Sequence, residues 1–154
     1  MLDLFFNLKV KHRNKKVYIY GAGMVAYYLA KYILSETEFD IDGFLVSDIN
    51  NNPKLIFEKP VFELSDKFKD ELVIIGTKEN LHNEINAKLE SLGYKNIIAI
   101  SNETYGDIRA KLPDTSYEMM NLIKSTNSNV MSSYSSLHND AMSIHAHINN
   151  FYQI

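Results

Sequence analysis

Six residues near the start of the chain carry its clearest chemical motif. Residues 21–26 read Gly-Ala-Gly-Met-Val-Ala, the pattern G-x-G-x-x-A, between a β-branched stretch and an amphipathic one. In this pattern the first glycine permits a tight turn and the second lets backbone N–H groups approach a phosphate at the positive end of a helix dipole. We therefore predict that five residues bind phosphate: Gly21, Ala22, Gly23, Met24 and Val25. The alternative is that these small residues serve only the strand-to-helix turn.

Polar residues follow two other predicted strands. Ser47 and Asp48 end the second strand, where an acidic residue typically accepts a hydrogen bond from a ribose hydroxyl. Asp48 is equally suited to capping a turn, because residues 50–52 are all asparagine, which is common in turns. Thr77 and Asn80 follow a later strand and should face the same crevice. Thr77 could touch a phosphate or base, whereas Asn80 is better explained as the cap of the next helix.

No catalytic constellation is evident. The chain has no cysteine, which excludes thiolate chemistry and disulfides. His145 and His147 are two residues apart and do not share a helix face, so they predict no metal site. Tyr27 and Lys31 have the Tyr-x-x-x-Lys spacing of short-chain dehydrogenases, but they fall in the first helix, where that chemistry is not placed. The sequence predicts a binding site and leaves open whether the chain is an enzyme.

The elements that position these residues alternate between strand and helix. Strands are predicted at residues 15–20, 39–46, 60–62, 72–76 and 96–100, and helices from about residue 24, at 63–69 and at 81–92. Alternation of this kind, with apolar runs, indicates a parallel sheet with right-handed crossovers. We predict an α/β fold with a doubly wound, mostly parallel, Rossmann-like sheet of about four to five strands, followed by a C-terminal helical segment.

The chain divides into three parts by pattern. Residues 1–14 form an N-terminal helix or arm, 15–112 the Rossmann-like nucleotide-binding domain, and 113–154 a helical appendage or linker. Apolar residues between 120 and 151 follow a heptad spacing with one polar member, Asn127. This spacing predicts either self-association or docking of a partner enzyme, or a linker helix that packs on its own domain or on a missing downstream domain.

The N-terminal arm allows two interpretations. Leu2, Phe5 and Phe6 precede a basic run and could dip into lipid as an interfacial anchor. The alternative, which the usual role of amphipathic helices favours, is a short helix that covers the edge of the domain. No apolar run approaches the roughly 20 residues of a membrane span, so we expect cytoplasmic residence with at most peripheral membrane contact.

Composition narrows the function classes. The 154 residues include 16 Lys and Arg against 19 Asp and Glu, a net charge of -3, with 45% hydrophobic residues. This balance is that of an ordinary globular protein, which argues against intrinsic disorder and provides no positive field for nucleic acid.

Six short segments stand in a distinctive order along the chain: residues 16–23, 42–48, 52–53, 60–65, 73–76 and 93–98. In this order they resemble the Rossmann-like module of bacterial cell-surface polysaccharide enzymes, which is similar to nucleoside-diphosphate-sugar epimerases and to the N-terminal domains of sugar acetyltransferases. The resemblance implies that residues 21–24 lie at the phosphates, with Ser47 and Asp48 near the ribose or base and Thr77 on the far wall. Neither the hexapeptide β-helix nor the second α/β domain of such enzymes follows, which implies a truncated or split member.

We therefore expect a nucleotide or nucleotide-sugar binding module in the biosynthesis of bacterial surface polysaccharide, such as capsule. Its ligand would be a nucleotide sugar or NAD(P), and its partner a second copy or a sugar-modifying enzyme bound through residues 120–151. Two alternatives stay open. One is a fragment of an NAD-dependent nucleotide-sugar epimerase or oxidoreductase, and the other is a non-catalytic, dimerising interaction protein.

Overall fold

The computed structural model describes residues 2–113 and contains six strands, four α-helices and two 3-10 turns. The strands are β1 (Val17–Tyr20), β2 (Gly43–Val46), β3 (Leu55–Ile56), β4 (Lys59–Glu63), β5 (Leu72–Ile75) and β6 (Asn96–Ala99). The helices are α1 (Leu2–Lys11), α2 (Met24–Glu36), α3 (His82–Ser91) and α4 (Asn102–Lys111), with 3-10 turns η1 (Asp66–Phe68) and η2 (Glu79–Leu81). Of the helical segment predicted at residues 113–154, all but residue 113 lies outside the described residues.

One sheet holds all six strands, in the order β3-β4-β2-β1-β5-β6. Every pairing is parallel except that of β3 with β4. β2 and β5 are buried at each of their residues, as expected for parallel strands with both faces covered. The predicted α/β fold with a mostly parallel sheet is therefore confirmed.

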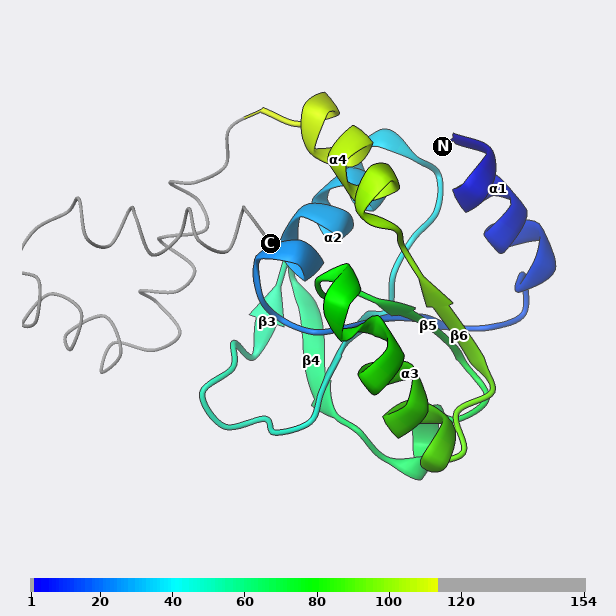
Figure 1. Cartoon of the computed structure of the whole chain (residues 1–154), viewed down its shortest axis with the longest axis vertical. Helices are drawn as coiled ribbons and strands as arrows, with labels where there is room; N and C mark the ends of the chain where they lie inside the picture. Colours follow the sequence, from blue (N-terminus) through cyan, green and yellow to red (C-terminus); the bar gives the residue numbers. More distant parts are fainter. Residues whose placement is uncertain (1, 114–154) are drawn as a thin grey trace, which may run out of the picture.

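Helices cover both faces of the sheet (Figure 1). Because side chains alternate along a strand, Ile19 and Tyr18 of β1 enter different cores. Ile19 joins the core beneath α1, α2 and α4, which includes Leu29 and Ile108. Tyr18 joins the core beneath α3, which includes Leu89. The carboxyl ends of the central strands are thus held between two packed layers.

Helix α1 packs against the domain through one face. Phe5 is 1% exposed and its ring lies 5.8 Å from that of Tyr32 and 6.2 Å from that of Phe39, measured between centroids. Phe6, the next residue, is exposed. The interfacial-anchor alternative is therefore wrong for Phe5, and the favoured interpretation, a short helix that covers the domain, agrees with this packing. Within residues 2–113, no helix has the length and apolarity needed to cross a bilayer.

The short strand β3 is an element that the sequence did not indicate, and it brings the strand count to six. It pairs with β4 through a two-residue turn, Phe57 and Glu58, with φ angles of 52° and 64°. Turns with two positive φ angles usually contain Asn-Gly, so these residues carry no hairpin signal. The Phe57 ring packs 4.8 Å from that of Tyr27, a tertiary contact that compensates for the strained backbone.

Two predicted element boundaries also differ. The strand predicted at 39–46 starts only at Gly43, because the Val17 N–H donates to the Asp42 carboxylate at 2.8 Å and not to a backbone carbonyl of that strand. The helix predicted at 63–69 is reduced to η1, because Glu63 still belongs to β4. Both differences arise from contacts between strands, and the residue pattern within a single segment does not indicate such contacts.

His12, just after α1, should make stability depend on pH. Its Nε2 atom is buried without a hydrogen-bond partner among the described residues, and burial together with Lys11 and Lys15 lowers its pKa below the ordinary 6.5. The folded state therefore binds fewer protons than the unfolded state, so this contribution to stability is complete above about pH 6.5 and declines on acidification. We expect the loss in thermal midpoint between about pH 7.5 and 5.5 to be smaller in His12→Gln than in the wild type. An equal loss in both proteins would contradict this role.

Candidate functional site

A small cavity lies where β1 and β5 end. Gly21 leaves β1 with φ +118° and donates its N–H to the Leu45 carbonyl at 2.8 Å, and Gly76 leaves β5 and donates to the Tyr20 carbonyl at 2.8 Å. The cavity between these turns has a volume of about 180 Å³. Its lining residues are Gly21, Ala22, Gly23, Met24, Val25, Gly76, Thr77, Lys78 and Leu81.

The three glycines of this cavity have different constraints. A Cβ atom on Gly21 would lie 2.9 Å from the Gly76 carbonyl oxygen, and one on Gly76 would lie 2.5 Å from Ile19 Cγ2 and 3.1 Å from Ala26. A Cβ atom on Gly23 would meet nothing within 4 Å. Gly21 and Gly76 are therefore required by packing and backbone geometry, whereas Gly23 leaves open space beside the helix terminus.

The amino terminus of α2 opens into this space. Gly23 is its N-cap residue and no side chain caps the first turn. At α4, by contrast, the Ser101 hydroxyl accepts the Thr104 N–H at 3.2 Å. The first N–H groups of a helix need an acceptor, and the helix dipole makes a negative one favourable. The geometry at α2 therefore suits an anion.

The loop after β5 supplies the opposite wall. Thr77 lines the cavity, and so does Lys78, a cation that the sequence interpretation passed over. His82 is buried and its Nε2 lies 2.9 Å from the Thr77 carbonyl oxygen, which holds the loop to α3. Lys78 stands beside Thr77 in the loop after β5, and its position there is the signal that could have identified it.

The predicted role of Asn80 as a helix cap is wrong. Asn80 is exposed inside η2, and the N-cap position of α3 is Leu81, with no side-chain cap. The 3-10 turn inserts between the strand and the helix, which displaces Asn80 from the cap. Asn80 is also absent from the cavity lining.

Ser47 and Asp48 lie outside the cavity, at the end of β2. One Asp48 carboxylate oxygen accepts the Asn50 N–H at 2.9 Å, as the turn interpretation predicts. The Ser47 hydroxyl lies 2.6 Å from the Tyr20 hydroxyl and accepts a hydrogen bond from the Lys88 ammonium. We call Tyr20, Ser47 and Lys88 the polar cluster. The sequence did not single out Lys88, because it is 41 residues from Ser47 and reaches it only through the packing of α3.

The site offers binding groups and no complete catalytic set. Glycine backbone, an uncapped helix terminus and Lys78 surround an apolar-walled cavity, and hydroxyl and ammonium groups stand at the neighbouring strand end. In the part of the chain that the structure describes, no group of three or more His, Asp or Glu residues could hold a metal ion.

Comparison of the chain with protein-family models, curated proteins and solved structures gave no match. Fold and site therefore define the protein by class only. It is an α/β protein with a glycine-lined cavity at the carboxyl edge of a mostly parallel sheet.

Proposed function

We propose that the protein binds a nucleotide or nucleotide sugar at the carboxyl edge of its sheet. The observation that carries this proposal is the position of the cavity relative to the strand order. The parallel strands run β4-β2-β1-β5-β6, so the chain moves outward from β1 in one direction and then returns to its other side at β5. This is the doubly wound, Rossmann-like order, in which ligands bind at the point where the order reverses. The cavity lies between the ends of β1 and β5.

The groups around the cavity support a phosphate ligand. The open N–H groups of α2 and the Lys78 cation would face the same small space from two loops. Charge-assisted hydrogen bonds of this kind bind phosphate strongly, and an apolar wall strengthens them by excluding water. The Gly23 position, where a side chain would find open space, is where phosphate oxygens would approach the backbone.

The size of the cavity indicates how the rest of the ligand would lie. Its volume of about 180 Å³ is below the roughly 300–1,000 Å³ of pockets that enclose whole small molecules. The cavity therefore suits the phosphates, and the ribose or sugar would extend along the open sheet edge. The polar cluster stands at the end of β2 on that edge, so Ser47 and Lys88 would meet hydroxyl groups there.

The biological role is a further step of the same proposal. The resemblance to modules of surface polysaccharide enzymes favours a nucleoside-diphosphate sugar over NAD(P). Five parallel strands with one glycine motif also fit a single nucleotide better than a dinucleotide, which uses two such halves. On this proposal the protein serves a sugar-modifying transferase or epimerase by binding its nucleotide sugar.

A thermal-shift screen tests the proposal. Uridine, guanosine and thymidine diphosphate sugars, NAD(P), coenzyme A, S-adenosylmethionine and free nucleotides would each be added to the full chain. A ligand at about 100 times its Kd stabilises the fold by about 2.7 kcal/mol, which raises the midpoint by several degrees. We expect such a shift with one class of nucleoside-diphosphate sugar. No shift with any of these compounds would contradict the proposal.

Two variants locate the site. Gly23→Val should keep the unliganded midpoint, since a Cβ atom there would meet nothing within 4 Å, and abolish the ligand-induced shift. Lys78→Gln should weaken binding about tenfold or more, the usual value of a hydrogen bond to a charged group. Lys95→Gln is the matched control, because this lysine pairs with Asp70 on the surface away from the cavity. Equal affinity of all three variants and the wild type would place the ligand elsewhere.

A further inference from the structure

The outer face of α1 is the part of the surface that the proposed function leaves unexplained. At about 100° per residue, Phe5 and Leu8 point into the core while Phe6 and Val10 point away from it. Phe6 is 66% exposed and Val10 48%, two of the most exposed large hydrophobic side chains among the described residues. Being four residues apart, they form one apolar ridge along the helix.

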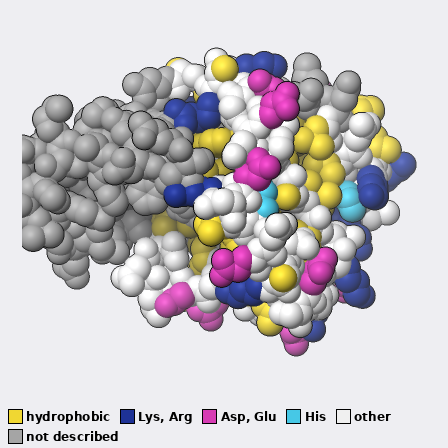
Figure 2. All heavy atoms as spheres, viewed as in Figure 1, with side chains coloured by type: hydrophobic (Ala, Val, Ile, Leu, Met, Phe, Trp, Pro, Cys, Tyr) yellow, Lys and Arg dark blue, Asp and Glu magenta, His cyan; other side chains and the backbone are white. Residues whose placement is uncertain are grey.

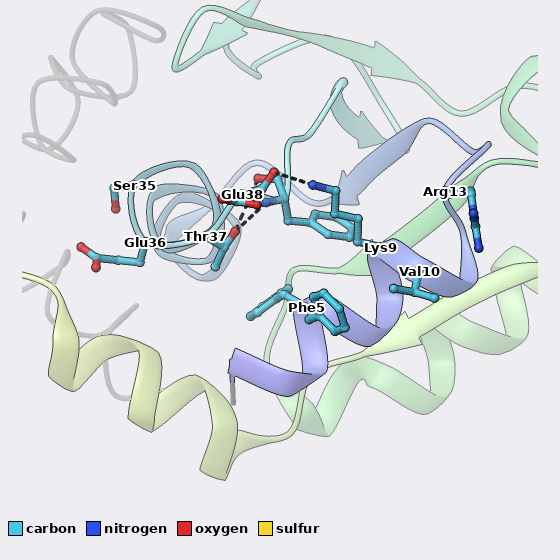
Figure 3. Close-up of a pocket in the computed structure, with 10 residues that line it drawn as sticks. Phe5, Lys9, Val10, Arg13, Ser35, Glu36, Thr37 and Glu38 are labelled. Carbon is cyan, nitrogen blue, oxygen red and sulfur yellow. Dashed lines mark hydrogen bonds between the residues drawn. The ribbon is translucent and has the colours of Figure 1, made fainter.

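A hollow continues this apolar surface beside the helix. It has a volume of about 700 Å³ and lies between α1 and residues 35–39, which comprise the end of α2 and the segment after it. Figure 3 shows Phe5, Lys9, Val10 and Arg13 along one wall, with Glu36, Thr37 and Glu38 along the other. The Lys9 ammonium reaches the Glu38 carbonyl oxygen at 3.5 Å, so it bridges the rim of the hollow.

Basic side chains surround the ridge. Five of the eight residues from 9 to 16 are basic and all five are exposed: Lys9, Lys11, Arg13, Lys15 and Lys16. In the space-filling view, hydrophobic and basic side chains lie together over α1 (Figure 2). Together with Phe6 and Val10 these five residues are called the basic-apolar face.

The charge of this face is not neutralised within the described chain. None of its five basic side chains forms an ion pair with a described carboxylate. Of the nearby acidic groups, Asp40 pairs with Lys59. Glu36 and Glu38 lie on the opposite wall of the hollow, and Asp42 and Glu71 accept the backbone N–H groups of Val17 and Lys16. Although the whole chain has a net charge of -3, residues 4–16 hold five Lys and Arg and no Asp or Glu, so the face itself is positive.

We infer that the basic-apolar face docks on an anionic phospholipid surface. Phe6 and Val10 enter the boundary between headgroups and acyl chains, and the lysine and arginine side chains extend to the phosphates. A second copy of the chain fits poorly, because a two-fold contact would place the same basic residues opposite one another. A nucleic-acid duplex would satisfy the charges, but its bases are stacked inside it and offer no apolar surface to the Phe6–Val10 ridge.

Docking through α1 would fix the orientation of the cavity relative to the membrane. The basic run leads into β1 at its amino end, whereas the cavity lies at the carboxyl end of the same strand. A protein docked through α1 would therefore present its cavity away from the membrane. This inference does not depend on the identity of the cavity ligand.

Vesicle sedimentation of the full chain tests the inference. We expect binding to phosphatidylcholine vesicles that contain about one third phosphatidylglycerol, and little binding to pure phosphatidylcholine. Raising sodium chloride from about 0.1 M to 0.5 M should weaken binding, because it screens the exposed charges. Each basic residue near an anionic surface contributes a factor of about five, so Lys11→Gln with Arg13→Gln should weaken partitioning about 25-fold.

The apolar ridge has a matched control elsewhere on the molecule. Phe6→Ser with Val10→Ser should reduce vesicle binding at least tenfold, whereas Leu55→Ser with Leu92→Ser, which alters two other exposed hydrophobic residues, should leave it unchanged. Far-ultraviolet circular dichroism would verify that each variant is folded. Equal binding of both double variants, or no binding of the wild type to anionic vesicles, would overturn the inference. Displacement of the vesicles by a short DNA duplex at the same phosphate concentration would also overturn it, in favour of a nucleic-acid site.

Discussion

Gly76→Ala should lower the free energy of unfolding by about 3 kcal/mol, the upper end of the usual cost of overpacking a core. The added methyl would lie 2.5 Å from Ile19 Cγ2 and 3.1 Å from the Cα and Cβ atoms of Ala26. Ile19 is fully buried in β1, and the Ala26 contact includes the backbone of α2, so neither group can rotate away. Urea denaturation followed by circular dichroism would measure the change, with the slope m verifying that the unfolded states are comparable.

Gly106→Ala is the control for this experiment. Gly106 lies inside α4, and a Cβ atom there would meet nothing within 4 Å. Because alanine is a better helix former than glycine, this variant should raise the free energy of unfolding by about 0.5–1 kcal/mol. If Gly76→Ala lowers the free energy of unfolding and Gly106→Ala raises it, the effect of packing is distinguished from the effect of backbone entropy. A Gly76→Ala protein as stable as the wild type would show that α2 does not pack on the junction of β1 and β5 as described.

The sequence predicted the glycine turn between strand and helix well because its parts are contiguous. Residues 21–25 all line the cavity, and the position of Ala26 against Gly76 explains why the motif ends in a small residue. A turn between a strand and a helix is specified by its own few residues. Whether this turn binds phosphate stays a prediction, which Gly23→Val tests.

The remaining parts of the site depend on residues that are distant in sequence. Lys88 reaches Ser47 only because α3 packs on the face of the sheet that holds Tyr18 and Leu45, and Tyr20 joins them as the last residue of β1. Likewise, the Phe57 turn of the hairpin is stabilised by Tyr27 on α2. Local patterns contain no information on such contacts, so the polar cluster and β3 emerged only from the folded chain.

The strand order was predictable in part. Alternating strands and helices with continuous apolar runs indicated parallel pairing, and this holds for every pairing except that of β3 with β4. The return of β5 to the far side of β1 is a topological choice that no single segment encodes. That choice places the end of β5 beside the glycine turn and so creates the second wall of the cavity.

Phe5→Ala should cost about 3–5 kcal/mol, the usual loss for truncating a buried phenylalanine. Phe5 is 1% exposed and contacts Tyr32 of α2 and Phe39 of the following loop, so its removal leaves a cavity between α1 and the domain. Phe6→Ala, the same change one residue further on, should alter stability by no more than about 0.5 kcal/mol, since that side chain is 66% exposed. Urea denaturation of the two variants would measure this difference.

Comparison of Phe5→Ala with Phe6→Ala also tests whether α1 is an integral part of the domain. If α1 were a detachable arm, both substitutions would leave the global unfolding transition in place, and the strong asymmetry between Phe5 and Phe6 would vanish. If α1 is integral, Phe5→Ala shifts the whole cooperative transition and Phe6→Ala does not. The second outcome would mean that the basic-apolar face is held rigidly on the folded domain. The vesicle-binding residues could then be changed without loosening the helix that presents them.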